Sequence, residues 1–89
     1  MKARAGSPMI RVHLASSLRD LTDGLSEVEV EAATVRRLIR SLDERFPGMG
    51  DRLAEGVSVS INGEIVPDAL YEDLPEGAEV HFLPTLSGG

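Results

Sequence analysis

One amphipathic helical segment, flanked on both sides by short alternating segments, is the feature that most constrains the fold of this chain. Between residues 35 and 46, apolar side chains recur at helical spacing along one face, and Thr34 stands where an N-cap is expected. Pro47-Gly48 ends the pattern. The apolar face consists of Val35, Leu38, Ile39, Leu42 and Phe46. Because the chain has 89 residues, we expect one domain, in which this helix packs against a sheet.

The segments around this helix alternate apolar and polar residues, which is typical of half-buried strands. The predicted strands are residues 10–14, 28–30, 57–61, 64–66 and 79–83. Asn62-Gly63 predicts a two-residue hairpin turn, and residues 50–56 are predicted to form a connector anchored by Leu53. The order predicts an α+β fold in which a mixed sheet of four to five strands wraps around one helix. Another small α+β sandwich is the alternative.

Two arginines, Arg36 and Arg37, stand near the start of the predicted helix. The start of a helix carries a partial positive charge, so cations are unfavourable there. The fold pattern gives no structural reason for them, and we assign them to a surface.

The chain ends in a short tail that follows the last predicted strand. Pro84 removes a ladder donor and is expected to stop sheet pairing, and Gly88-Gly89 closes the chain. Glycine adds no side chain to a core, but a backbone without Cβ atoms can pass through a channel too narrow for other residues. We therefore expect the Gly89 carboxylate to be delivered into the active site of another protein, with Gly88 allowing the tail to thread. A frayed, idle end is the alternative.

These patterns divide the chain into three parts. Residues 1–8 are small and polar and predict a disordered N-terminal extension. Residues 9–83 form the folded domain, and residues 84–89 form a flexible tail. An extended tail spans roughly 20 Å at about 3.3–3.6 Å per residue. That length is enough to enter a buried pocket while the domain stays outside.

Charge and composition exclude several classes of function. A net charge of −6 and a pI near 4.7 argue against nucleic-acid binding and suit a partner with a basic docking surface. The chain has no cysteine, which excludes disulfides and a thiolate nucleophile. Apolar runs are too short to span a membrane, and a secretory signal is absent, so we expect a cytoplasmic protein.

Two histidines, His13 and His81, raise the question of a metal site. Without further ligands at suitable spacing, surface histidines are the better interpretation, and we expect no metal. The sequence also lacks an oriented nucleophile with its base and a glycine loop that opens a helix. We therefore do not expect an enzyme.

Several segments together resemble a known family. They are residues 10–14, the Arg19 segment, the Thr34-Val35 helix start with Leu38, Val59-Ser60-Ile61-Asn62-Gly63-Glu64, and Gly77-x-Glu79-Val80-x-Phe82-x-Pro84-x-x-x-Gly88-Gly89. On these segments the chain resembles the ubiquitin-like β-grasp sulfur carriers, the family of the molybdopterin synthase small subunit and the thiamine-pathway sulfur carrier. The likeness covers residues 9–89, and the last motif is its specific part.

The resemblance implies a function. The C-terminal glycine, Gly89, would be adenylated with ATP by a ubiquitin-activating-like adenylyltransferase/sulfurtransferase, and sulfur would then replace the AMP to leave a thiocarboxylate. The thiocarboxylate would pass its sulfur to a downstream synthase in molybdenum cofactor, cysteine or other sulfur-metabolite biosynthesis. On this reading the protein is a co-substrate that binds no cofactor itself, although it could be counted as the small subunit of a sulfurtransferase. The alternatives are a ubiquitin-like modifier conjugated through Gly89 and a non-catalytic interaction module.

The resemblance also implies where partners bind. If the first and last strands are neighbours, Arg11, His13, His81 and Leu83 share the sheet face away from the helix. The predicted partner-binding residues are Arg11, His13, His81, Leu83, Pro84, Leu86, Ser87 and Gly88. Leu83 and Leu86 are the expected apolar anchors, because an exposed leucine beside a functional tail favours binding.

Overall fold

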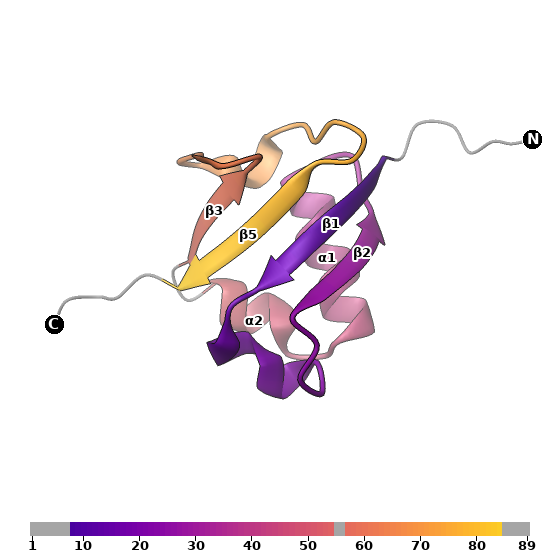
Figure 1. Cartoon of the computed structure of the whole chain (residues 1–89), viewed down its shortest axis with the longest axis vertical. Helices are drawn as coiled ribbons and strands as arrows, with labels where there is room; N and C mark the ends of the chain where they lie inside the picture. Colours follow the sequence, from indigo (N-terminus) through magenta and orange to yellow (C-terminus); the bar gives the residue numbers. More distant parts are fainter. Residues whose placement is uncertain (1–7, 55–56, 85–89) are drawn as a thin grey trace, which may run out of the picture.

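A computed structural model describes residues 8–54 and 57–84, which form one mixed sheet with its helices on one side (Figure 1). The strands are β1 (Met9–Leu14), β2 (Glu27–Glu31), β3 (Val57–Ile61), β4 (Glu64–Ile65) and β5 (Glu79–Pro84). Their order in the sheet is β2-β1-β5-β3-β4. β1 and β5 pair in parallel at the centre, and the other neighbours are antiparallel. The predicted α+β architecture with a mixed sheet is confirmed.

The main helix, α1 (Val35–Arg45), lies across one face of the sheet. Its N-cap is Thr34, as predicted, and the Thr34 side chain accepts a hydrogen bond from the Arg37 backbone N–H at 3.2 Å. Three further helices complete the fold. They are η1 (Ser16–Leu21, 3₁₀), α2 (Met49–Ala54) and η2 (Ala69–Tyr71, 3₁₀).

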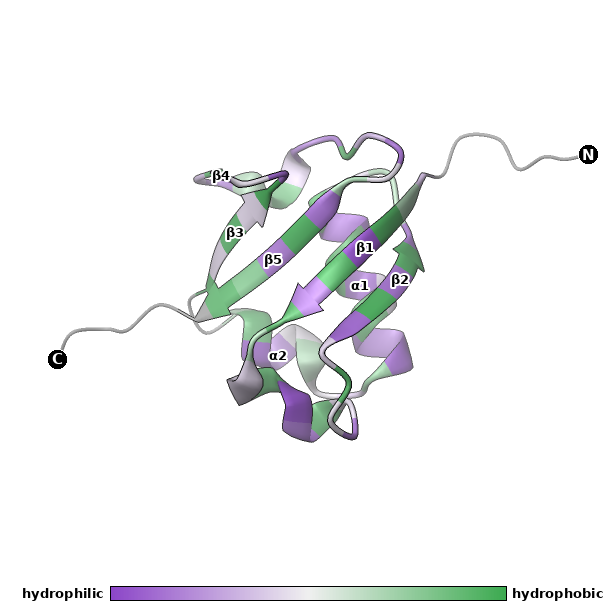
Figure 2. Ribbon diagram, in the orientation of Figure 1, coloured by the Kyte–Doolittle hydropathy of each residue, from purple (hydrophilic) through white to green (hydrophobic). Residues whose placement is uncertain are grey.

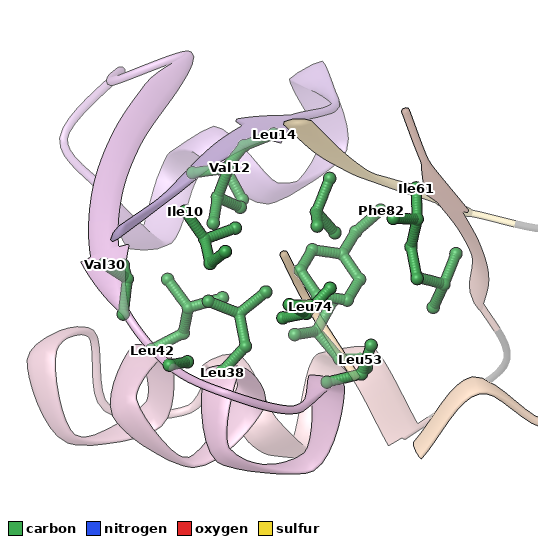
Figure 3. Packing of buried hydrophobic residues seen from close by; sticks show 14 of the residues in the cluster. Ile10, Val12, Leu14, Val30, Leu38, Leu42, Leu53, Ile61, Leu74 and Phe82 are labelled. Atoms are coloured by element: carbon green, nitrogen blue, oxygen red, sulfur yellow. The ribbon is translucent and has the colours of Figure 1, made fainter. Parts of the chain in front are cut away.

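The core lies between α1 and the inner face of the sheet (Figure 3). The strands contribute alternate residues to it, and Figure 2 shows this alternation as successive hydrophobic and hydrophilic bands along β1, β2 and β5. The fully buried side chains of the central strands and of α1 are Ile10, Val12, Val80, Phe82, Val35, Leu38 and Leu42. Ile39 and Phe46, predicted on the same helix face, are partly buried at the margin of this core. The core is thus largely aliphatic, with the ring of Phe82 at its centre.

The segment predicted as a connector, residues 50–56, differs in the structure. Most of it belongs to α2, and residues 55 and 56 lie outside the described ranges. Met49 and Leu53 stand four residues apart and are both buried, which gives this short helix an apolar face. The Asp43 carboxylate accepts a hydrogen bond from the Gly50 N–H at 2.8 Å and so satisfies a free donor at the helix start. Leu53 anchors this connecting segment as predicted, but its helical structure was not predicted.

The Asn62-Gly63 hairpin turn between β3 and β4 is confirmed. Both residues have positive φ, 51° and 89°, as a two-residue turn of the mirror-image type requires. The Asn62 side chain accepts a hydrogen bond from the Glu79 N–H at 3.0 Å, and the Asn62 N–H donates to the Glu79 carbonyl at 2.8 Å. The turn therefore also fixes the start of β5, the strand that leads to the tail.

Replacing Leu38 by alanine is expected to lower the free energy of unfolding by about 2–5 kcal/mol, because its fully buried side chain fills the space between α1 and the sheet. Urea denaturation measures this change. The matched control is Glu44→Ala on the exposed face of the same helix, for which a change within about 0.5 kcal/mol is expected. Equal effects of the two substitutions would contradict the described core.

Candidate partner-docking face beside the carboxyl-terminal tail

The sheet face away from α1 brings four of the predicted site residues together. β1 and β5 are parallel neighbours, with Arg11 opposite Glu79 and His13 opposite His81. Since Val12, Val80 and Phe82 point into the core, the alternate residues of both strands point outward. Arg11, His13, His81 and Leu83 therefore share this outer face, as the family resemblance implied.

The two histidines form the centre of the outer face. Their rings stack with centroids 4.3 Å apart and planes 8° from parallel. His13 Nε2 lies 3.1 Å from Glu79 Oε1, which holds the His13 ring in place. On the other side of His81, in the neighbouring strand β3, Ser60 is its pairing partner. The two stacked rings thus come from the two central strands, one from each, and lie side by side on the outer face.

Arg11 lies at the acidic side of the face. Its guanidinium Nε lies 3.0 Å from Glu27 Oε2, and Nη2 lies 3.6 Å from Glu29 Oε2. Both glutamates are on β2, so the ion pairs connect neighbouring strands, and all three side chains are about half exposed. With Glu79 nearby, the carboxylates outnumber the guanidinium, and this side of the face is negative. Arg11 contributes less positive charge to docking than the sequence alone suggested.

Leu83 lies on the side nearest the tail. It is 40% exposed and stands opposite Ser58 of β3. A shallow hollow of about 370 Å³ lies between His81, Leu83 and Arg19. The Arg19 side chain is held there by a hydrogen bond from its Nε to the Leu14 carbonyl at 3.3 Å. An exposed leucine beside a fixed cation and two imidazoles offers a partner an apolar contact together with polar ones.

The tail itself begins where β5 ends. Pro84 is paired with Val57 of β3 and is the last described residue, so the strand extends one residue beyond the predicted residues 79–83. The predicted site residues Leu86, Ser87, Gly88 and Gly89 lie outside the described residues. The last described residue before the tail therefore belongs to the middle strand of the sheet and directly follows Leu83 of the outer face.

Sequence reasoning did not single out Arg19, Glu79 or Ser60 as part of this face. Arg19 is distant from β5 in the sequence and reaches the face because η1 folds back at the end of β1. In the sequence, Glu79 and Ser60 look like ordinary solvent-exposed positions of alternating strands. They lie next to the histidines because β5 pairs with β1 and β3, which are distant from each other in the sequence. The Arg19 segment was one of the segments that carry the family resemblance, and this was the one sequence signal that could have pointed to Arg19 as part of the face.

The described residues contain neither a metal-binding cluster nor a membrane-spanning helix. Across the described parts of the chain, histidines and carboxylates do not gather into a group of three or more that could hold a metal ion. None of the helices in residues 8–54 and 57–84 combines the length and the apolar composition that a membrane crossing requires.

The topology and the exposed central strands define a ubiquitin-like β-grasp domain. A chain of the BexX/CysO complex of Amycolatopsis orientalis superimposes with a TM-score of 0.81 at 28% identity, covering 90% of this chain and 99% of that one. SAMP1 of Haloferax volcanii superimposes with a TM-score of 0.75 at 26% identity, covering 91% of this chain and 99% of that one. The β-grasp prediction is confirmed.

Sequence comparison then identifies the family. The model of the ThiS family matches residues 12–89. The molybdopterin synthase sulfur carrier subunit of Pyrenophora tritici-repentis (strain Pt-1C-BFP) is 32% identical over 91 residues, which cover 99% of this chain and 96% of that protein. The chain therefore belongs to the ThiS family of ubiquitin-like sulfur carriers. The Pyrenophora relative is a sulfur carrier subunit, and this protein is likewise a sulfur carrier and not itself a catalyst.

Proposed function

We propose that this protein carries sulfur as a thiocarboxylate on Gly89, made by an adenylating enzyme that docks on the outer face. The observation that carries the proposal is the Gly88-Gly89 terminus of a ThiS-family chain, reached directly from β5 and its exposed Leu83. A carboxylate is a poor electrophile, so it needs a leaving group before sulfur can be attached. The tail supplies the carboxylate, and the folded domain supplies recognition.

The chemistry takes two steps on the partner enzyme. A Gly89 carboxylate oxygen attacks the α-phosphorus of ATP, and pyrophosphate leaves with the electrons of the broken P–O bond. A sulfide equivalent then attacks the acyl carbon, and AMP leaves, so that one carboxylate oxygen departs with AMP and sulfur takes its place. ATP is consumed by the partner enzyme, and this chain holds no cofactor of its own. The resulting sulfur is nucleophilic and remains attached to a protein that a second enzyme can recognise.

The outer face favours a partner with a basic docking surface. Glu27 and Glu29 pair with Arg11, Glu79 pairs with His13, and the whole chain has a net charge of −6. Complementary charge speeds encounter, while the leucine beside the tail provides the desolvated contact that slows dissociation. The Amycolatopsis structure is that of a two-protein complex, which supports recognition by a partner protein.

The pathway that we propose is cofactor or sulfur-metabolite biosynthesis. The Pyrenophora relative is a molybdopterin synthase subunit, which supports a downstream synthase that accepts sulfur for the molybdenum cofactor. The likeness to the BexX/CysO complex supports a second acceptor class, in which the sulfur enters cysteine or another metabolite. Both assignments use the same thiocarboxylate, and the acceptor enzyme decides between them.

Exchange of labelled pyrophosphate into ATP tests the activation step. With the candidate activating enzyme present, the exchange is expected to depend on this chain and to slow as salt rises, because screening weakens the charge complementarity. A chain in which Gly89 carries a C-terminal amide is the matched control, since it keeps every side chain and removes the reacting carboxylate. Equal exchange with the amidated chain would contradict the proposal.

A second candidate function is that of a protein modifier, favoured by the likeness to SAMP1, which is a small archaeal modifier protein. Activation of Gly89 would be the same, and a lysine amine would replace sulfur as the nucleophile. Covalent conjugates of higher mass that survive reducing agents and carry a Gly89–lysine bond would favour this function over sulfur transfer.

A further inference from the structure

The exposed side of α1 carries three arginines that the folded domain does not use. Arg36, Arg37 and Arg40 surround a hollow of about 160 Å³. They are three of the nine lysines and arginines in a chain of net charge −6. Arg36 and Arg37 lie in the first turn of α1, where the helix dipole disfavours cations, and this turn contains no acidic residue; Arg40 follows one turn later. A concentration of positive charge at this place makes the helix less stable, so its reason lies outside helix formation.

Partners within the described residues do not explain these arginines. In residues 8–54 and 57–84 the basic side chains that form ion pairs are Arg11, His13 and Arg52. Arg36 lies over the Tyr71 ring, with 6.0 Å between its guanidinium carbon and the ring centroid. Tyr71 is itself 75% exposed. The arginines therefore present their donors outward, where they can meet an acidic ligand.

An apolar groove of about 610 Å³ lies beside this cluster. Its walls come from α1, α2, β3, β4 and η2, and their apolar residues include Ile39, Leu53, Val57, Ile65 and Leu70. Ile65 is 59% exposed and Leu70 is 47% exposed, so large apolar side chains meet water here. Among the described residues of the lining, Asp68 is the charged one. A groove of this kind is suited to an apolar side chain.

The arginine cluster and the groove are parts of one continuous surface. At 3.6 residues per turn, the side chains of Arg36 and Arg40 are rotated around the axis of α1 by about 60° and about 100° from that of Ile39. Both rotations are in the same direction, so the two arginines lie on the same side of Ile39. On the other wall, Leu70 precedes Tyr71, which contacts Arg36. A ligand whose apolar side chain enters between Ile39 and Leu70 would therefore have acidic neighbours within reach of two guanidinium groups.

We propose that this surface, made of the α1 arginines and the groove beside them, binds an acidic polypeptide segment that carries a large apolar side chain. The apolar side chain enters the groove, and its flanking carboxylates pair with Arg36 and Arg40, whose planar forks match carboxylate geometry. Nucleic acid fits less well, because the net charge of the chain repels phosphates and a phosphate backbone leaves the groove unfilled.

This surface is separate from the face assigned to the activating enzyme. α1 covers the inner side of the sheet, whereas His13, His81 and Leu83 lie on the outer side (Figure 1). The two sites also differ in charge, since Arg11 on the outer face pairs with two carboxylates, whereas three arginines gather around the hollow on α1. The protein can therefore be held by an acidic partner while its tail remains available, a property that goes beyond sulfur transfer itself.

Selection of peptides from a random library on the full-length protein tests the proposal. The selected peptides are expected to combine aspartate or glutamate with leucine, isoleucine, methionine or phenylalanine. Their affinity is expected to fall at least about tenfold in two variants, Arg36→Glu/Arg40→Glu and Leu70→Asp. Thermal unfolding of each variant confirms that it is folded.

The matched control is Arg45→Glu, on the opposite side of α1, where the guanidinium donates to the Glu29 carbonyl at 3.1 Å. It reverses the charge of one arginine, where Arg36→Glu/Arg40→Glu reverses two, and is expected to keep the affinity. Selected peptides without acidic residues, or peptides that bind both test variants as tightly as the parent protein, would overturn the proposal. Binding of an RNA homopolymer that is lost in Arg36→Glu/Arg40→Glu and kept in Leu70→Asp would also overturn it, because the cluster would then be a general polyanion site.

Discussion

Deleting Gly89 is expected to abolish activation of the tail, with a loss in rate of at least about 10²-fold. Removal of one extended residue withdraws the terminal carboxylate by about 3.3–3.6 Å. A misplacement of about 1 Å already costs on the order of 10²-fold when the reacting atoms must be aligned. The measurement is the rate of pyrophosphate exchange with the activating enzyme.

Substitution of Gly88 by valine tests the threading role separately. The chain length stays the same, but the branched side chain cannot enter a channel shaped for a bare backbone, so a comparable loss is expected.

The control for the Gly89 deletion is deletion of Ala3. It shortens the chain by the same one residue, near the other end, and is expected to keep full activity. A chain that lacks Gly89 and is still activated at the parental rate would show that the terminal carboxylate is not the reacting group.

Replacement of Leu83 by aspartate is expected to weaken binding to the activating enzyme by at least about 30-fold, equivalent to about 2 kcal/mol. Leu83 is 40% exposed on the outer face and stands directly before the tail, so a docked partner must bury it. A charge buried there without a counter-ion costs desolvation energy. Calorimetry measures the dissociation constant.

Met9→Asp is the matched control for Leu83→Asp. Met9 is 43% exposed on the same outer face, but it lies at the opposite end of β1, about 20 Å from the level of Leu83 at about 3.3 Å per residue. Its replacement is expected to change the binding by less than about threefold. Equal losses in the two variants would place the docking site away from the tail.

Much of the fold was predictable because this chain signals its elements locally. The alternation in β1 and β5, the helical spacing from Val35 to Leu42 and the Asn62-Gly63 turn all reflect short-range geometry, and each is present as expected. The short helix α2 was missed because two glycines, Gly48 and Gly50, flank Met49 and suggest a break in any helix. Its stabilising contact, from Asp43 to Gly50, is a tertiary interaction that periodicity does not reveal.

The candidate site was predictable in part. Placing Arg11, His13, His81 and Leu83 on one face required that β1 and β5 be neighbours, which followed from the family resemblance and not from the spacing of residues. The stacking of the two imidazoles and the pairing of Arg11 with two glutamates depend on side-chain conformations, and a sequence pattern does not specify these. The arginines at the start of α1 were conspicuous in the sequence, but the groove beside them is assembled from five separate elements.

The most direct test of the central claim is the intact mass of the protein after incubation with ATP, a sulfide source and its activating enzyme. The account predicts a gain equal to the exchange of one oxygen for one sulfur, located at Gly89 by fragmentation and absent when ATP is omitted. An unchanged mass, measured while the same enzyme preparation activates a known carrier, would contradict the assignment of this protein as a thiocarboxylate carrier.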